Sequence, residues 1–241
     1  RVALGAICKN FLEDANINIS SRVLSIGSVS DNSIIKNYNN LNDRIDSSPL
    51  RCYSKNIEKK MINEIDKCNK KGDTIGGKIE IIATGLPYGL GSYIQWDKKI
   101  STIISSLLLS INAFKSLTIG SELGVLGSDY HDEISWSEDK FKRDSNSAGG
   151  IEGGMSNTNP IIIRMEMKPL STLRKSLKST DIKTKQSESA HKERSDVCAV
   201  PAASIVAEGM LSFALVETLL DKFGGDSMKQ FKAHLDLSAK Y

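Results

Sequence analysis

The sequence has few cysteines, and they do not form a disulfide framework or a metal site. The four are Cys8, Cys52, Cys68 and Cys198; none makes a Cys-x-x-Cys pair or lies near a histidine at metal-ligand spacing. Scattered thiols of this kind indicate a reducing compartment, so we expect a cytoplasmic protein without a bound metal.

Signals for membranes and export are also missing. No apolar run reaches the length that a bilayer span requires, and no signal peptide is visible at the start of the chain. We therefore expect no association with a membrane.

An excess of one charge sign is lacking too. The 32 Lys and Arg and 29 Asp and Glu leave a net charge of +3, and aromatic residues are not interleaved with basic clusters. We therefore expect no nucleic-acid partner. The 241 residues, 39% hydrophobic and 25% charged, fit one large or two small globular domains.

An initiator methionine is the last notable absence. The first residues have a helical pattern at once, with Ala3, Leu4, Ile7 and Phe11 on one face. Nothing precedes them that could cap the free N–H groups of a first helical turn. We therefore expect further sequence upstream of Arg1.

Apolar periodicity predicts a mixture of helices and strands. Helices are expected over 1–12, 57–71, 97–111 and 201–223, and strands over 22–29, 78–84, 116–120 and 161–167. The polar segments 31–56 and 173–193 are expected to be surface loops. Because two of the helices are strongly apolar, we expect an α+β fold with a core of helices covered by sheet.

A glycine-rich run before the strand at 161–167 is the first candidate site. Its four glycines, within residues 149–154, allow the backbone to approach a ligand closely. The strand then leads to Lys168, Ser171 and Thr172, which offer one ammonium and two hydroxyl groups. This pattern fits an anion site and fits equally an ordinary strand with a tight turn.

A second candidate, Arg194-Ser-Asp196, lies just before the last helix. Arginine can bind a phosphate through two parallel hydrogen bonds, and a carboxylate beside it can move a proton. Taken alone, however, this segment fits a surface ion pair or a helix entry better.

The histidines give weaker signals. His131-Asp132-Glu133 could suggest a metal, but neighbouring side chains of an extended segment point to opposite sides, so a solvated loop is favoured. His191 and His234 are expected to be exposed. The glycines of 85–91 do not match a dinucleotide fingerprint.

The order and spacing of six segments resemble those of the chorismate synthase family, most of all its bacterial form. The segments are Gly72–Gly77, Thr84–Ser92, Ser110–Phe114, Ala148–Asn157, Lys168–Thr172 and Arg194–Pro201. The resemblance covers nearly the whole chain and corresponds to the C-terminal two-thirds of the family sequence. It therefore implies one chorismate synthase domain over 1–241 that is incomplete at its N-terminus.

The resemblance also implies an activity. Family members are lyases of the shikimate pathway of aromatic amino acid biosynthesis, and they convert 5-enolpyruvylshikimate 3-phosphate to chorismate and phosphate by 1,4-elimination. They require reduced FMN, and NADPH only where the protein also reduces its own flavin. The implied fold is an α+β sandwich of buried helices between antiparallel sheets, and the implied assembly is a homotetramer.

Site residues follow from matching motifs. The residues that match the family's flavin site are Asn112, Ala113, Gly153, Lys168, Pro169, Leu170, Ser171, Thr172 and Arg194. Asp196 matches the family aspartate that assists proton transfer near the flavin. No metal ligand is implied.

This chain departs from the family pattern in several places. Thr158 stands where glycine is usual, Leu170 where isoleucine is frequent and Ser171 where proline is frequent. The segment 120–124 differs from a glycine–phenylalanine stretch, and the polar segment 31–56 is longer than usual.

The family's catalytic histidines and an Arg-Ser-Ser flavin motif match nothing in these 241 residues. An alternative to the lyase is therefore a non-catalytic fragment that binds flavin or a partner subunit. We expect the isolated chain to be inactive.

Overall fold

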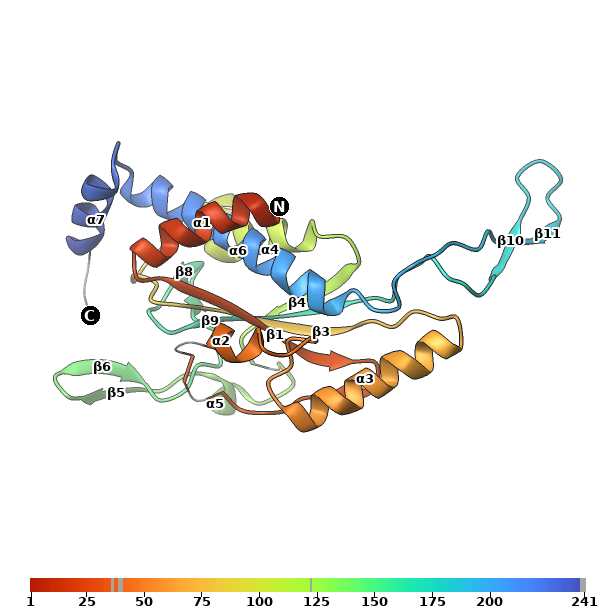
Figure 1. Ribbon diagram of the computed structural model, residues 1–241. Helices are drawn as coiled ribbons and strands as arrows, with labels where there is room; N and C mark the ends of the chain where they lie inside the picture. The colour runs from red at the N-terminus through yellow and green to blue at the C-terminus, as the bar shows by residue number, and fades with distance from the viewer. Residues whose placement is uncertain (36, 39–40, 122, 239–241) are drawn as a thin grey trace.

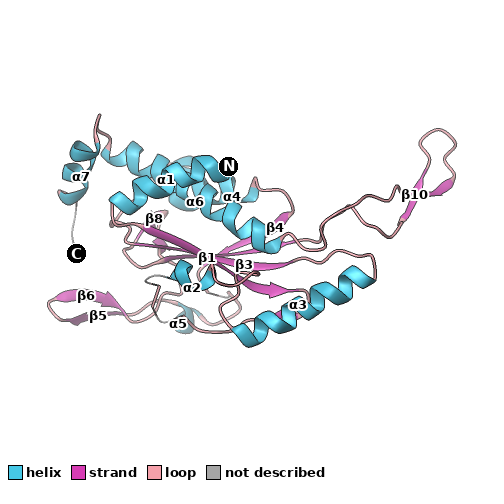
Figure 2. Ribbon diagram, in the orientation of Figure 1, coloured by secondary structure: helices cyan, strands magenta, loops and turns pink. Residues whose placement is uncertain are grey.

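The computed structural model describes residues 1–241 except 36, 39–40, 122 and 239–241. Its centre is a five-stranded antiparallel sheet with strand order β2-β1-β3-β9-β4. The strands are β1 (Asn18–Ile26), β2 (Val29–Ser30), β3 (Gly77–Thr84), β4 (Phe114–Ile119) and β9 (Ile161–Met167). The helices α1 (Val2–Asp14), α4 (Ile100–Leu109) and α6 (Val200–Phe223) lie against one face of this sheet (Figures 1 and 2).

Shorter elements surround this body. The helices are α2 (Leu41–Ile45), α3 (Lys55–Lys70), η1 (Trp96–Lys98), α5 (Gly127–Tyr130) and α7 (Met228–Asp236). Three two-stranded hairpins are formed by β5 (Ile134–Ser137) with β6 (Lys140–Arg143), β7 (Ile151–Glu152) with β8 (Met155–Ser156), and β10 (Lys178–Thr180) with β11 (Ser187–Ser189).

Period-two alternation divides the sheet into two different faces. Along β9, Ile161, Ile163 and Met165 are fully buried in the main core with the apolar side chains of α4 and α6. On the other face, Arg164 and Arg22 donate to the two carboxylate oxygens of the buried Glu80 on β3, at 3.0 and 2.7 Å. The helix side of the sheet is therefore apolar, and the opposite side holds charges in pairs.

Helices α1 and α6 cross at two glycines. A Cβ on Gly5 would lie 2.3 Å from the Cα of Gly209, so the two backbones touch there. One residue before this crossing, the buried Glu208 accepts hydrogen bonds from Lys9 at 2.8 Å and from Arg51 and Ser21 at 2.7 Å. This carboxylate ties α6 to α1, to β1 and to the end of the polar segment 31–56.

The expected α+β class with antiparallel sheets is confirmed, and so are all the expected helices and strands, with boundaries shifted by a few residues. Two expected loops contain structure: α2 lies within 31–56, and the hairpin β10–β11 lies within 173–193. Both are too short for periodicity to reveal: α2 has only Leu41 and Ile45 as buried apolar residues, and β10 and β11 have none.

The expectation that no apolar run reaches membrane-spanning length is wrong for α6. This 24-residue helix has a mean hydropathy of 1.6 over its most apolar 18-residue window and is the one helix of the described residues that passes that test. Within that window 61% of the residues are buried inside the molecule. Scattered polar residues such as Glu208 hide the run from a search for an unbroken apolar stretch.

The sheet covers one face of the helix layer. On the opposite face, where Figure 1 shows no strand of the described chain above α1, side chains such as Leu4 and Ile7 are 61% and 69% exposed. The described residues thus form one sheet and one helix layer of the expected sandwich.

Candidate functional site

The end of β9 is where the first predicted residues meet. The backbone N–H of Lys168 donates to the carbonyl of Ala113 at 2.9 Å. Ala113 follows α4 and has a φ of 72°, a left-handed conformation that turns the chain sharply into β4. This turn places Asn112 and Ala113 beside Lys168, although 55 residues separate Ala113 from Lys168 in the sequence.

The segment before β3 joins them. A Cβ on Gly76 would lie 2.2 Å from the carbonyl oxygen of Met167, so only glycine permits this close approach. The Thr74 hydroxyl donates to the carbonyl of Leu170 at 2.6 Å, and the N–H of Ile75 donates to the carbonyl of Val197 at 2.8 Å. These contacts hold together the two segments that flank residues 173–193.

We call the predicted site residues that lie at this end of the sheet the strand-end cluster. It comprises Asn112, Ala113, Lys168, Pro169, Leu170, Ser171, Thr172, Arg194 and Asp196. Nine of the ten residues that the sequence predicts therefore lie around one end of the sheet.

The charges of the cluster are exposed. Among the described residues, Lys168, Arg194 and Asp196 form no ion pair; the Lys168 ammonium donates only to the carbonyl of the adjacent Pro169, at 3.3 Å. No side chain caps the start of α6. The expected surface ion pair is therefore not found among the described residues, whereas the expected helix entry holds, because the segment leads into α6 at Val200. Both cations can receive an external anion.

A hollow of about 390 Å³ lies beside Asn112. It is lined by Arg1, Ile111, Asn112, Ala199, Ala202, Ala203 and Val206. The lining comes from the apolar start of α6 and the end of α4, together with the polar residues Arg1 and Asn112. Its volume and mostly apolar lining are those of a small-molecule site.

Gly153 lies elsewhere. It forms the tip of the β7–β8 hairpin, with a φ of 60° and open space where a Cβ would be. The carbonyl of the next residue, Gly154, accepts from the N–H of Ile100 at 2.9 Å, at the first residue of α4. Asn112 follows the last residue of α4, and a ten-residue helix is about 15 Å long. Within one chain, the structure does not bring Gly153 to the strand-end cluster.

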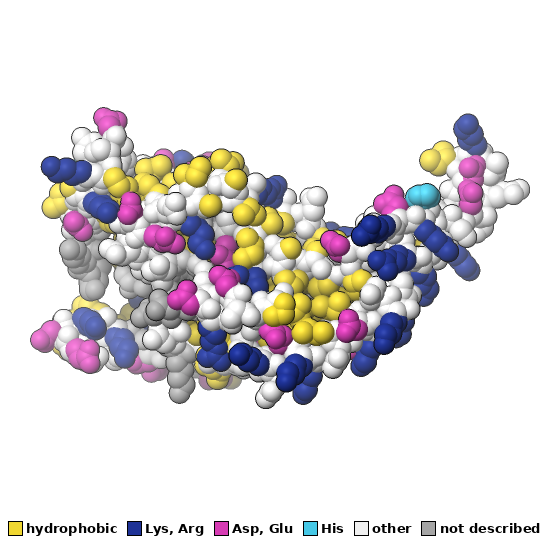
Figure 3. Space-filling view, in the orientation of Figure 1, with side chains coloured by type: hydrophobic (Ala, Val, Ile, Leu, Met, Phe, Trp, Pro, Cys, Tyr) yellow, Lys and Arg dark blue, Asp and Glu magenta, His cyan; other side chains and the backbone are white. Residues whose placement is uncertain are grey.

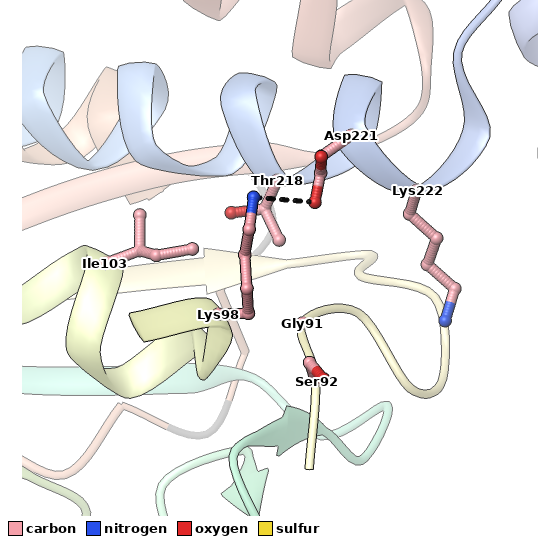
Figure 4. A pocket seen from close by; sticks show the side chains of 7 residues that line it. All are labelled: Gly91, Ser92, Lys98, Ile103, Thr218, Asp221 and Lys222. Atoms are coloured by element: carbon pink, nitrogen blue, oxygen red, sulfur yellow. Dashed lines mark hydrogen bonds and ion pairs between the residues drawn. The ribbon is translucent and has the colours of Figure 1, made fainter. Parts of the chain in front are cut away.

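A second hollow, of about 160 Å³, contains none of the predicted residues (Figure 4). It lies between η1 and the last turns of α6. Lys98 pairs with Asp221 at 3.4 Å, and Lys222 donates to the carbonyl of Gly89. Because both cations are already engaged, this hollow offers an anion less than the strand-end cluster does.

Asp132 is a residue whose role the sequence missed. Its carboxylate accepts from the Ser145 hydroxyl and from the backbone N–H groups of Ser147, at 2.6 Å, and Ala148, at 3.0 Å. Burial raises the pKa of Asp132, but these hydrogen bonds and the nearby Arg143 outweigh it, so the pKa lies below its usual value. The segment 131–133 is the exposed loop that was expected, and within it Asp132 anchors the turn that precedes the glycine-rich run.

Metal ligands are not gathered anywhere in the described part of the chain: no three His, Cys, Asp or Glu side chains lie close enough together to hold an ion. The four cysteines are free thiols. Burial raises the pKa of Cys52 to about 12, so its thiol stays protonated.

An antiparallel sheet under a layer of apolar helices, with unpaired cations at one strand end, defines an α+β protein with a candidate anion site. The chorismate synthase family profile matches residues 1–220. This chain belongs to the chorismate synthase family.

Individual relatives agree with this assignment. Chorismate synthase of Syntrophotalea carbinolica is 42% identical over 244 residues, covering 100% of this chain and 63% of the relative. Chorismate synthase of Listeria welshimeri is 44% identical, covering 98% of this chain and 62% of the relative. A solved structure titled "Crystal Structure of Chorismate Synthase" has a TM-score of 0.81 and 37% identity, and the match covers 97% of this chain and 66% of that one. The chain thus spans slightly under two thirds of the length of these relatives.

Proposed function

We propose that this protein acts in the elimination of phosphate from 5-enolpyruvylshikimate 3-phosphate, which yields chorismate in the shikimate pathway. One observation carries the proposal: in a member of this family, Lys168, Arg194 and Asp196 come together at one strand end with no ion-pair partner among the described residues.

The residues present fit reduced FMN as the cofactor. The apolar hollow beside Asn112 suits the flavin ring, and Lys168, Arg194 and the hydroxyls of Ser171 and Thr172 suit its phosphate. When bound, reduced FMN supplies a reducing centre whose oxidation state is the same before and after the reaction.

The side chains of the cluster have distinct roles in this proposal. The elimination breaks one C–O bond and one C–H bond: the proton passes to a base, the C–H pair forms a new ring double bond, the existing ring double bond shifts toward the carbon that bears the phosphate, and phosphate leaves with the C–O electron pair. Asp196 assists proton transfer near the flavin, since an exposed carboxylate can take and return a proton. The cations of the cluster hold anionic groups in place.

The assembly and compartment are part of the same proposal. The homotetramer is the assembly that family membership implies, whereas apolar side chains exposed on the helix layer, such as Leu4, Ile7 and Phe213, suit the second sheet of the sandwich. Free thiols fit the cytoplasm. NADPH takes part only if the protein reduces its own flavin.

The proposal is tested by supplying the protein with reduced FMN and 5-enolpyruvylshikimate 3-phosphate without oxygen and following chorismate absorbance. Sustained turnover supports the lyase. Flavin binding without turnover reduces the function of this chain to cofactor binding, the alternative that the sequence left open. If neither flavin nor substrate binds, the proposal is overturned.

A further inference from the structure

The chain between β9 and α6 leaves the body as a long arm, residues 173–193, which ends in the β10–β11 hairpin (Figure 1). Its two legs are joined by backbone hydrogen bonds from Glu193 to Leu173, at 3.2 Å, and from Ala190 to Leu177, at 2.8 Å. We call the part between these two bonds the neck. It comprises Arg174, Lys175 and Ser176 on one leg and His191 and Lys192 on the other.

The arm concentrates the positive charge of the protein. Six Lys and Arg against three Asp and Glu give residues 173–193 a formal net charge of +3, equal to that of the whole chain. The neck holds three of these cations and no acidic residue, whereas the tip, 178–189, balances three lysines with two acids. Figure 3 shows Lys and Arg side chains gathered where the arm leaves the body.

The neck cations are unsatisfied. Among the described residues none forms an ion pair, and Arg174 donates to the neutral amide of Asn69, at 3.3 Å. Lys175 and Lys192 lie on opposite legs of the neck, outside the paired strands β10 and β11, and both side chains are exposed. An anion bound at the neck would offset part of this local excess of positive charge.

The neck adjoins the strand-end cluster. The N–H of Lys175 donates to the carbonyl of Gly72 at 3.1 Å, which fixes this leg against the segment that contacts Met167 and Leu170. On the other leg, Arg194 follows the last hydrogen-bonded residue, Glu193. A ligand that leaves the neck toward the body therefore meets Lys168 and Arg194 next.

We propose that the neck captures phosphate monoesters and directs them to the strand-end cluster, an inference that rests on the proposed function. Fields from clustered charges raise the association rates of oppositely charged ligands by about 10- to 1,000-fold, and salt suppresses the effect. The neck thus sets how fast FMN or the phosphorylated substrate arrives, and the cluster sets how tightly it stays.

Stopped-flow flavin fluorescence tests this with two double variants of equal charge change. Lys175→Glu with Lys192→Glu alters the neck, and Lys183→Glu with Lys185→Glu alters the tip. At low salt we expect the neck variant to associate with FMN about tenfold more slowly than the tip variant. The difference should vanish at about 1 M salt, where the Debye length is about 3 Å. Dissociation rates should stay alike.

Other outcomes decide against the proposal. Equal slowing by both variants would mean that only net charge matters, and a change confined to dissociation would make the neck a binding site instead. If the unaltered protein does not bind FMN, the proposed function fails first, and the neck is then tested with inorganic pyrophosphate by NMR. Shifts of the amides at 174–176 and 191–192 but not at 182–186 support the neck, and their absence overturns it.

Discussion

The body and the arm of this protein treat charge in opposite ways. In the body, the carboxylates of Glu80 and Glu208 are buried, and each is held by two cations. In the arm, cations are exposed and form no ion pair with any described residue. Charges of the body therefore hold the fold together, while charges of the arm and its base are free for a ligand. Substitutions in the two regions should affect different measurements.

The largest effect is expected where the arm joins the body. If Asp196 assists proton transfer, Asp196→Asn should lower turnover by about 10²–10⁴-fold, the range for general acid–base groups, in a chain completed with the family's N-terminal catalytic segment. Flavin affinity and thermal stability should change little because the shape is kept. Glu188→Gln, an exposed carboxylate on β11, is the matched control and should leave turnover unchanged. Near-normal turnover of Asp196→Asn would remove this residue from the mechanism.

In the body, removal of a buried carboxylate should lower the free energy of unfolding. Glu208→Ala leaves the buried Arg51 guanidinium and Lys9 without their shared carboxylate. Removing one partner of a buried ion pair costs about 3–5 kcal/mol. Urea unfolding measures it, with the exposed Glu217→Ala on the same helix as control. A loss below that of the control would mean that solvent already screens this network.

Lys168→Ala tests whether the strand-end cluster binds the flavin. A hydrogen bond to a charged group is worth about 1.5–3 kcal/mol, so FMN affinity should fall by about one to two orders of magnitude. Stability should not change, since the Lys168 ammonium contacts only a neighbouring carbonyl. A flavin titration checks this, with Lys178→Ala on β10 as control. Unchanged affinity would take Lys168 out of the flavin site.

Asp132 allows a test by pH. Because its folded pKa is lowered, its contribution to stability is present above the unfolded value of about 3.9 and is lost as pH falls through the folded pKa. Asp132→Asn should therefore destabilise the protein by about 1 kcal/mol near pH 7 and by less in acid. Thermal unfolding at several pH values measures the difference in stability between the variant and the unaltered protein. A difference that stays constant down to pH 3 would assign the effect to something other than ionisation.

Long amphipathic elements were predictable because their periodicity reports the buried face directly. Helix α3 and strand β9 carry that signal over their whole length. Clustering of residues far apart in sequence was not predictable from periodicity, because it depends on backbone contacts such as Ala113 with Lys168. Motif resemblance supplied those residues, but it could not tell that Gly153 lies at the other end of α4.

Asp132 and the hairpin β10–β11 were missed for a related reason. Both depend on hydrogen bonds to residues whose spacing a local pattern does not encode. The arm also buries almost nothing, so its sequence carries no apolar alternation from which a strand could be recognised.

The smallest effect is expected at Thr158, one of the positions where this chain departs from the family pattern. Thr158, where the family usually has glycine, is exposed and has a φ of 73°. A side chain in this left-handed region costs about 1–2 kcal/mol, and glycine removes that strain but loses about 0.5–1 kcal/mol in chain entropy. Thr158→Gly should thus stabilise the body by at most about 1.5 kcal/mol, a rise of a few degrees at most in Tm. Thr180→Gly, on the exposed strand β10, should give no rise; equal shifts in both variants would show that Thr158 is not strained.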